Sequence, residues 1–597
     1  MSSVARSLMP SAPVIHWSVL AALLAALLLG AATFDRGSWP SVVGDEATYL
    51  MQAESLAWDR DLEYSRRDYE RFVRHREVPP EGLILQKGGE SESLVYGKPF
   101  FYALWSAPFV RLSPTRGPFV ANALLLALAA VASARALRRP MGPAAPSWIA
   151  LAVFGSVAFA HVFWAHLDLF LMSLAALGLA LTFGAGRVPP DGRSAARTLL
   201  RWTAAGLLLA TVAYSRPVYL PLYLPALVVA RRRGGWRGVA GLAAGTVLLG
   251  LGSLVVQQSL AGSWSSYGAE RRSFYSATGF PEVDLPAEDW DALIERWGNA
   301  SWLKPAAYRG LSAGTPRLWA WNLVYFFAGR AVGLLPYLLP GLLGFLTWWR
   351  APPGAARWGL LAAVAVTALG FLVLRPFNFY GGGGALANRY ILPVYPALWF
   401  VPTRPLRAPW LAVAALVAAP FLWPLWTAPR AFPVDEHGQF RHVSAVARAV
   451  LPYETTQSHM KPTGPKVNVH HRGLWIKSVA PAVWTPDAGG VFLFDPRLGP
   501  AELLVGSEEP LQALHLEVGA GAPPFRVEGG RVTGAIELDG GRTRLWIELD
   551  EPRARHPMWW LRDRDFTLYL LGLDVEERSR RSTGDVPVEI TLAPSAR

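Results

Sequence analysis

Apolar stretches long enough to cross a lipid bilayer recur through the first three quarters of this chain, and short basic loops separate them. A helix needs about 20 apolar residues to cross the hydrocarbon core. Within that core every backbone polar group must find a partner in the protein, which favours helices. The first run, 14–34, follows Arg6 and is long enough to span, so we interpret it as a retained helix and not as a cleaved signal peptide. The chain is therefore predicted to be a polytopic α-helical membrane protein.

We predict about eleven spanning segments. They cover 14–34, 117–137, 147–164, 167–185, 201–214, 217–230, 236–256, 323–347, 357–374, 390–402 and 408–427. The segment 99–112 is apolar but short and carries Pro108. We predict that it forms an interfacial helix along the membrane surface.

The composition excludes some classes of function. Hydrophobic residues make up 52% of the chain and charged residues 17%. The formal net charge of +13 is compatible with nucleic-acid binding, but the basic residues lie in short loops between apolar segments, so no nucleic-acid partner is expected. The chain has no Cys, which excludes disulfides and thiolate metal sites.

Arginine bias sets the expected orientation, because short cytoplasmic loops are enriched in basic residues. Alternate loops carry the following residues: Arg135, Arg138, Arg139, Arg187, Arg193, Arg197, Arg201, Arg231, Arg232, Arg233, Arg237, Arg350, Arg357, Arg404 and Arg407. We place these loops and the N-terminus in the cytoplasm. The loops 35–116 and 257–322 and everything after 427 are then expected on the outer side, which is periplasmic or extracellular.

Two acidic sites fall on that outer side. Asp45 and Glu46 begin an amphipathic segment just after the first span, which is predicted to be a helix on the membrane surface. Carboxylates are favoured at a helix N-terminus, so capping alone would explain this pair. Asp168 enters an otherwise apolar helix from an outward turn, where a charge needs a partner or a water-filled cavity. Their shared side of the membrane indicates a site.

Basic and aromatic residues on the same side are candidates for holding a phosphate group. They are Arg389 and Tyr390 after a Gly-rich loop, Arg216 in a tight turn, and Lys98 beside the interfacial helix. Contact with phospholipid headgroups is the alternative for each. The run 381–384 is interpreted either as a phosphate cradle or as a hinge. His161 and His166 are five residues apart, a spacing that does not favour a metal site, and we expect packing or headgroup contact there.

The composition changes after 427. A connecting segment, 428–466, precedes alternating apolar and polar runs separated by Gly and Pro turns. These runs predict an extracytoplasmic β-sandwich-like domain at 467–597. Its tryptophans either stack on sugars or form the core of the domain; they are Trp475, Trp484, Trp546, Trp559 and Trp560.

Four stretches together resemble a known family. They are GDEATYLMQAESLAWDRDL (44–62), YGKPFFYALWSAPFVRL (96–112), HLDLFLMSLAALGLAL (166–181) and ANRYILPVYPAL (387–398). In their order and predicted side they resemble the GT-C superfamily of integral-membrane glycosyltransferases, which use sugars linked to lipid phosphates. The bacterial branch related to protein O-mannosyltransferases and aminoarabinose transferases is the most similar. The resemblance covers about 14–427, by topology and motifs.

The resemblance implies a GT-C-like transmembrane catalytic domain at 1–427 and a set of roles. Asp45, with Glu46 beside it, would be the general base or a metal-linked acid, and Asp168 would be the second acidic site. Arg389, Tyr390, Arg216 and Lys98 would bind the donor phosphate. A divalent metal is possible at Asp45 and Asp168, and no other cofactor is named. The loop 257–322 would lie over the site.

The expected activity is transfer of a hexosyl or pentosyl group from a polyprenyl-phosphate-linked donor to a lipid, glycan or protein acceptor. The outer face of the cytoplasmic membrane is the expected place. One alternative is a transporter or flippase of lipid-linked substrates, which would carry ionisable residues at mid-span. Here they cluster at the outward ends of the spans. A non-catalytic cell-envelope scaffold is the other alternative.

Overall fold

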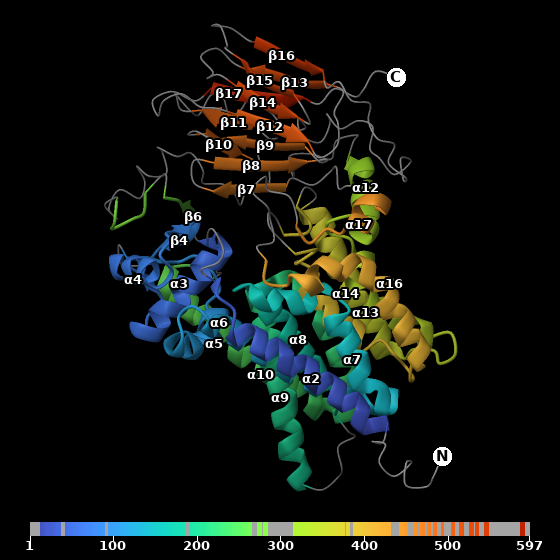
Figure 1. Ribbon diagram of the computed structural model, residues 1–597. Coiled ribbons are helices and arrows are strands. Elements are labelled where there is room, and N and C mark those ends of the chain that lie inside the picture. Colours follow the sequence, from blue (N-terminus) through green and yellow to red (C-terminus); the bar gives the residue numbers. More distant parts are fainter. Residues whose placement is uncertain are drawn as a thin grey trace.

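The structure is a computed structural model of the whole chain. It describes 12–36, 42–89, 93–185, 192–264, 271–276, 279–284, 315–375, 378–381, 386–431 and 441–451, and separate strands between 459 and 591. Most of its helices gather into one bundle (Figure 1).

Five helical stretches in the described part are long and apolar enough to cross a membrane. They are Val14–Ala32, Gly117–Phe154, Pro217–Ala261, Ala355–Leu374 and Ala408–Thr427. Leu167–Phe183 and Leu334–Thr347 are shorter apolar helices. These stretches include α2 (Ala12–Ala32), α6 (Gly117–Met141), α8 (Leu167–Phe183), α10 (Tyr223–Ala261), α14 (Ala355–Leu374) and α16 (Ala408–Thr427). A further helix of the bundle, α9 (Gly192–Ser215), is not among them. The chain is a multi-pass membrane protein, whereas the number eleven stays a prediction.

The long element α10 is folded back on itself. Gly235 has φ 59° and ψ −148°, which breaks the helix. The Thr246 hydroxyl donates to the Tyr223 hydroxyl over 2.9 Å. A straight helix would separate those residues by about 35 Å, at 1.5 Å per residue. The two halves of α10, 223–234 and 236–261, are therefore antiparallel helices joined at Gly235. They overlap the predicted segments 217–230 and 236–256, of which 217–222 is the 3-10 helix η4 (Pro217–Leu222).

Several expected spans are wrong as continuous helices. The segment 390–402 forms only the 3-10 turn η8 (Leu392–Val394) and the five-residue helix α15 (Tyr395–Trp399). Its prolines, Pro393 and Pro396, have no N–H to donate, so the apolar run cannot continue as one helix. The segment 147–164 divides likewise into α7 (Ala145–Phe154) and η3 (Val157–Phe163).

The segment 323–347 is also broken. It contains the end of α12 (Thr315–Ala328), then α13 (Leu334–Leu343) and the turn η7 (Gly344–Thr347). Pro340 lies inside α13, and Leu338 has non-helical dihedral angles. Pro340 has no N–H to donate and its ring crowds the carbonyl four residues earlier, which favours such a break.

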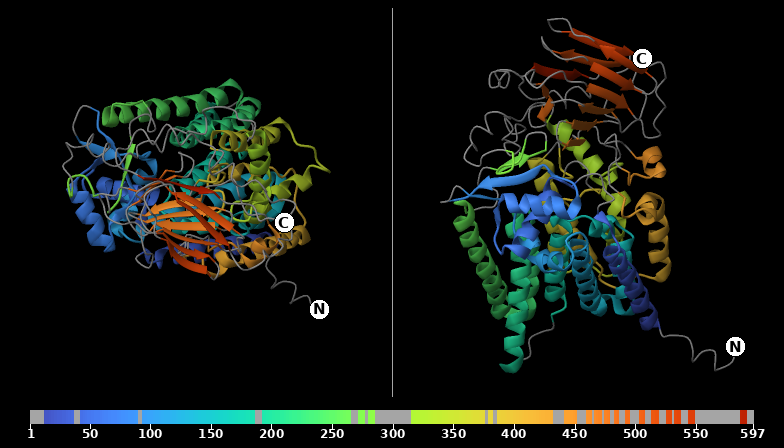
Figure 2. Two further views of the ribbon diagram at one scale, coloured as in Figure 1. Left: turned by 90° about the horizontal axis from the view of Figure 1, so that it is seen from above. Right: turned by 60° about the vertical axis from the view of Figure 1, so that its left-hand side comes forward.

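The two outward loops of the prediction share one sheet. β4 (Leu83–Lys87) pairs antiparallel with β5 (Leu94–Tyr96) and with β6 (Arg271–Phe274), and β2 (Glu63–Tyr64) completes the edge. The helices α3 (Asp45–Trp58), α4 (Arg66–Arg76) and α5 (Phe101–Leu112) lie beside this sheet (Figures 1 and 2). The sheet explains how a strand from the loop 257–322 reaches the first loop.

The helix α3 is not the surface helix expected from its amphipathic pattern. Residues 46–55 of α3 are all buried, polar ones included. The Thr48 hydroxyl accepts the backbone N–H of Ile84 over 2.9 Å, and the Gln52 amide donates to the Lys98 carbonyl over 3.2 Å. The strand β4 and the residues before α5 cover α3, so residues 46–55 have no exposed face. Partners distant in sequence supply the hydrogen bonds that its polar side chains need.

The C-terminal part contains two sets of paired strands. One sheet has the order β10-β11-β17-β13-β16 and the other β15-β14-β12-β9-β8-β7. The strands are β7 (His459–Thr463), β8 (Lys466–His471), β9 (Leu474–Ser478), β10 (Ala482–Thr485), β11 (Val491–Phe494), β12 (Leu503–Ser507), β13 (Ala513–Val518), β14 (Phe525–Gly529), β15 (Val532–Ile536), β16 (Thr543–Glu548) and β17 (Val586–Thr591). The domain boundaries and the β-sandwich stay predictions. The tryptophan side chains expected there lie outside the described residues.

Candidate active site

Asp45 is placed at the first position of α3 by an unusual turn. Gly44 precedes it with φ 62° and ψ −122°, a conformation open to glycine. The Gly44 N–H donates to the Glu81 carbonyl over 2.6 Å, beside the short parallel pair of β1 (Val42–Val43) and β3 (Pro80–Glu81). The first loop thus fixes where α3 starts, and with it the direction of Asp45.

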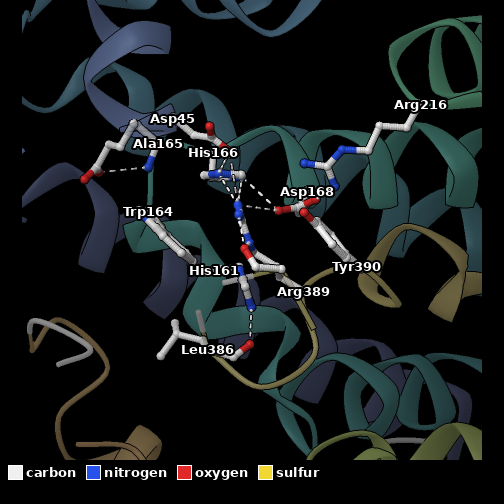
Figure 3. Close-up of polar contacts among 12 residues, drawn as sticks. Asp45, His161, Trp164, Ala165, His166, Asp168, Arg216, Leu386, Arg389 and Tyr390 are labelled. Carbon is white, nitrogen blue, oxygen red and sulfur yellow. Dashed lines mark hydrogen bonds and ion pairs between the residues drawn. The ribbon is translucent and has the colours of Figure 1, made fainter. Parts of the chain in front are cut away.

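The Asp45 carboxylate faces three cationic or imidazole groups. Lys98 Nζ lies 2.5 Å from Oδ1, and His166 Nε2 lies 3.0 Å from Oδ2. Arg389 Nη1 lies 3.3 Å from Oδ2. These partners come from the approach to α5, the start of α8 and the segment before η8, so three distant parts of the chain meet at Asp45. Figure 3 shows His166 and Arg389 beside Asp45.

Asp168 lies deeper in the same cluster. It occupies the first turn of α8, where the helix dipole favours a carboxylate. Its Oδ1 is ion-paired with Arg216, and its Oδ2 lies 2.8 Å from His166 Nδ1 and 3.4 Å from Arg389 Nη1. Asp168 is 0% exposed and Asp45 20% exposed. The partner that a charge in an apolar helix requires is therefore present.

His166 is the central residue that the sequence interpretation missed. Its two ring nitrogens face the two carboxylates, one each, and Arg389 contacts Nε2 as well (Figure 3). The expectation of packing or headgroup contact is wrong for this residue. Its position two residues before Asp168, in the same outward turn, was the available signal. His161 instead bonds the Leu386 carbonyl at 3.0 Å.

Glu46 points away from the cluster. Its carboxylate pairs with Arg36, with Nη2 at 2.5 Å and Nε at 3.3 Å, and it accepts the Ala165 N–H over 3.2 Å. Arg36 and Glu46 are 2% and 3% exposed. Glu46 therefore does not lie beside Asp45 in the cluster as expected, because successive residues of a helix point about 100° apart. Glu46 holds the turn that carries His166.

Tyr390 and the two arginines form one stack. The Tyr390 ring is stacked on Phe371, with centroids 4.5 Å apart and planes inclined by 18°. The guanidinium carbons of Arg216 and Arg389 lie 5.0 and 5.5 Å from the centroid of the same ring. An aromatic face attracts cations at this range. Tyr390 therefore holds both guanidinium groups near Asp168.

Gly381 fixes the other side of Arg389. The Gly381 carbonyl accepts from Arg389 Nε over 2.8 Å and also from Nη2. Gly381 has φ +109°, and a Cβ built there would lie 2.4 Å from Arg389 Nε, so the position requires glycine. Its N–H donates to Asn378 Oδ1 over 3.1 Å, which contradicts a phosphate-cradling role for that N–H. Residues 382–385, the rest of the expected cradle, lie outside the described residues.

The charges of the cluster leave it net positive. Two carboxylates, Asp45 and Asp168, stand against the cations Lys98, Arg216 and Arg389. Burial raises the pKa of Asp45, but Lys98 and His166 more than offset this, so its pKa lies well below the ordinary value. Burial lowers the pKa of Lys98, while Asp45 opposes that shift. The cluster therefore offers an ionised carboxylate beside an excess of positive charge.

The exposed fractions show which groups a ligand can reach. Lys98 and Arg389 are 12% exposed and Arg216 13%, whereas His166 is 2% exposed and Asp168 fully buried. The open side of the cluster thus presents Asp45 and the cations. Asp168 and His166 lie behind them.

The two acids do not fit a divalent metal as they are placed. Among the described residues there is no group of three or more His, Asp or Glu arranged to hold one. Both oxygens of Asp45 and both of Asp168 already face Lys98, an arginine or His166. A metal held by these carboxylates would have to displace that set of partners.

Comparison with known proteins returned one similar solved protein. No family model matches the chain, and no curated protein matches it significantly. Structures of ArnT from Cupriavidus metallidurans match in two states. The state bound to undecaprenyl phosphate is 16% identical and gives a TM-score of 0.38, covering 71% of this chain and 67% of that chain. The apo state is 18% identical and gives 0.35, covering 71% and 66%.

This chain spans about two thirds of the ArnT length. At these TM-scores the likeness carries no argument about substrate or mechanism.

Proposed function

We propose that this protein transfers a sugar from a polyprenyl-phosphate-linked donor to an acceptor at the outer face of the cytoplasmic membrane. One observation carries the proposal: an ionised carboxylate, Asp45, lies within 3.3 Å of the cations Lys98 and Arg389 at the accessible side of the cluster. Transfer from a phosphate leaving group needs both kinds of group. One takes a proton, and the other stabilises the phosphate charge.

In the proposed reaction, Asp45 takes the proton from an acceptor hydroxyl or amine. The freed oxygen or nitrogen attacks the anomeric carbon of the sugar, and the bond from that carbon to the phosphate oxygen breaks. The electron pair of that bond leaves with the polyprenyl phosphate. Lys98, Arg389 and Arg216 then bind the charge that develops on the phosphate oxygens.

The resting ion pairs explain how one site serves both tasks. Without donor, Lys98 and Arg389 neutralise Asp45. A donor phosphate between those cations competes with the carboxylate for them. Asp45 loses part of its stabilisation and becomes a stronger base once the donor is in place. The donor phosphate therefore prepares the base for the acceptor.

Asp168 and His166 act as positioning residues in this scheme. Asp168 is fully buried and pairs with Arg216, and His166 joins it to Asp45. Neither presents an accessible atom comparable to Asp45. Their contribution is to hold the arginines and the base at fixed separations, because productive geometry depends on such support.

The direction of the site in the membrane is part of the proposal. Arginine bias in alternate loops favours a cytoplasmic N-terminus and an outward first loop. The acceptor is a lipid, glycan or protein reached from that side. The C-terminal strands would lie there too, as an extracytoplasmic β domain.

Mass spectrometry of polyprenyl-phosphate lipids tests the proposal in three strains: wild type, a deletion, and the deletion carrying Asp45→Asn at matched protein level. A glycosylated carrier should accumulate in both mutants, and the mass of the adduct would identify the sugar class. Lipids that change in the deletion but recover with Asp45→Asn would favour a flippase or scaffold over a transferase. Unchanged lipids in both would contradict the donor assignment.

A further inference from the structure

Two buried histidines grip consecutive residues of the chain just before Arg389. His161 on η3 lies with Nε2 3.0 Å from the Leu386 carbonyl, so this nitrogen is the donor (Figure 3). The Ala387 N–H donates to His442 Nε2 over 3.3 Å. His161 is 1% and His442 3% exposed. We call this pair the histidine clamp.

The residue inside the clamp has a backbone conformation that needs support. Ala387 has φ +55°, the left-handed region, and it is 1% exposed. A residue with a Cβ adopts this region only at a cost in free energy, because the Cβ crowds the following carbonyl oxygen. Such a conformation persists where the surroundings determine it. The two hydrogen bonds of the histidine clamp fix both the C=O and the N–H of the Leu386–Ala387 peptide, and so stabilise this conformation.

The clamped conformation directs Arg389 into the cluster. The Arg389 N–H donates to the carbonyls of Tyr380 and Ala387, at 3.1 Å each. The turn at Ala387 lies two residues before Arg389 and so sets the direction in which the backbone enters Arg389, whose guanidinium contacts Asp45 and Asp168. A different φ at Ala387 would carry Arg389 out of reach, because the chain direction after that residue would change.

His442 comes from a distant part of the chain. It lies beyond α16, in the stretch 441–451 that leads toward the C-terminal strands. That stretch is docked at its far end too, since Arg330 Nε donates to the Leu451 carbonyl over 3.3 Å. The edge of the Tyr337 ring packs on His442, with centroids 5.6 Å apart. His442 also lies 3.5 Å from the Ala331 carbonyl, to which an accepting Nε2 cannot donate.

We propose that His442 is a positioning residue for the donor site: through the histidine clamp it holds Ala387 in its left-handed turn and so places Arg389. This inference rests on the proposed function in assigning the donor phosphate to Arg389. It also joins the stretch 441–451, which follows α16, to the site through one hydrogen bond.

Binding of undecaprenyl phosphate to the purified full-length protein in detergent tests the proposal. His442→Leu removes the acceptor, whereas His442→Gln keeps one, because Oε1 of Gln occupies nearly the place of Nε2 of His. We expect His442→Leu to raise the Kd about tenfold, which corresponds to about 1.4 kcal/mol. We expect His442→Gln to restore the Kd to within about threefold of wild type. His16→Leu, which removes a bond to Ser147 elsewhere in the bundle, is the control and should bind normally.

A second pair keeps the test decisive if His442→Leu is lost from the membrane. His161→Leu removes the donor to Leu386, and His161→Gln retains one, so the same contrast should appear from the other side of the histidine clamp. Wild-type affinity in the Leu variants would overturn the proposal. Equal weakening by Leu and Gln at either position would overturn it as well, because bulk packing would then explain the effect.

Arg389→Ala separates this inference from the proposed function. If Arg389→Ala binds undecaprenyl phosphate as wild type does, the donor assignment itself fails, and the histidine clamp cannot act through it. If Arg389→Ala weakens binding while His442→Leu does not, only the inference about His442 fails. Weakened binding in both, with rescue by Gln, supports the two together.

Discussion

His166 Nδ1 lies 2.8 Å from the Asp168 carboxylate, and both residues belong to the turn that begins α8. Residues two apart on a helix face different directions, yet His166 is the N-cap and has an extended backbone, with φ −138°. That conformation lets the imidazole fold back over Asp168 and reach Asp45 with its other nitrogen. One short turn therefore links a fully buried acid to the accessible one.

Asp45→Asn should abolish sugar transfer while leaving the fold intact. The carboxylate at the accessible side would be lost without a change in shape, and a positioned general base contributes about 10²–10⁴-fold in rate. The measurement is single-turnover transfer in proteoliposomes, alongside the thermal midpoint. Asp59→Asn, at the other end of α3, is the matched control and should transfer normally. Transfer within threefold of wild type in Asp45→Asn would remove Asp45 from the chemistry.

Lys98→Met should move the acid limb of the pH–rate profile upward. Lys98 and His166 hold the pKa of Asp45 well below its ordinary value against the effect of burial. The ionised form is therefore present above that low pKa, and activity is lost only as pH falls through it. Without Lys98 burial is less opposed, so the pKa of Asp45 rises and protonation begins at higher pH.

The profile of kcat/KM against pH measures this shift, because it reports groups of the free enzyme. A uniform fall in rate with an unmoved acid limb would mean that Lys98 binds the donor phosphate but does not tune Asp45. Gln86→Met is a suitable control, since Gln86 is a buried polar residue of β4 outside the cluster.

Glu46→Gln should destabilise the protein. It leaves the buried Arg36 guanidinium facing a neutral amide, and breaking a buried ion pair costs about 3–5 kcal/mol. The double variant Arg36→Met/Glu46→Met should recover part of that loss, since no buried charge is left unmatched. Thermal unfolding in detergent compares the three proteins. A stable Glu46→Gln protein without transferase activity would return Glu46 to the catalytic role first expected for it.

Gly381→Ala should weaken donor binding. The added Cβ would meet Arg389 Nε at 2.4 Å, and the positive φ of Gly381 disfavours alanine. Arg389 would have to leave the Gly381 carbonyl, and its contacts with Asp45 and Asp168 would change with it. A titration with undecaprenyl phosphate should show a raised Kd. Gly250→Ala, where a Cβ meets nothing within 4 Å, should bind as wild type.

The sequence predicted most of the polar residues of the site, while the side of the membrane on which they lie stays a prediction. Asp45, Asp168, Arg216, Lys98 and Arg389 were assigned to outward turns by arginine bias, and they meet in space. The side of the membrane predicted for a loop depends on the order of the spans along the chain, and a hydropathy pattern contains that order. Whether Glu46 turns inward with Asp45 depends on packing against Arg36 and Ala165, which no local pattern contains.

The misplaced segments have a similar cause. Hydropathy at 390–402 measures how apolar a segment is, and the segment is buried almost throughout. Hydropathy cannot distinguish a spanning helix from a short buried helix when prolines interrupt the apolar segment. For His166 the sequence offers a metal site, which its spacing from His161 does not favour, or packing or headgroup contact; none of these describes a link between two carboxylates. An imidazole ring that contacts two carboxylates, as His166 does, requires no particular sequence spacing from another histidine.

The pairing of β4 with β6 has a consequence for the order in which this protein assembles. Leu83 pairs with Phe274 and Gln86 with Arg271, so the sheet beside α3 stays incomplete until the ribosome has made the helices between them. Arg389 is synthesised later still, and His442 after it. Asp45 is therefore among the first of these residues made, yet the last part of its environment arrives when more than two thirds of the chain exists. A nascent chain that stalls earlier carries the base without the charges that surround it.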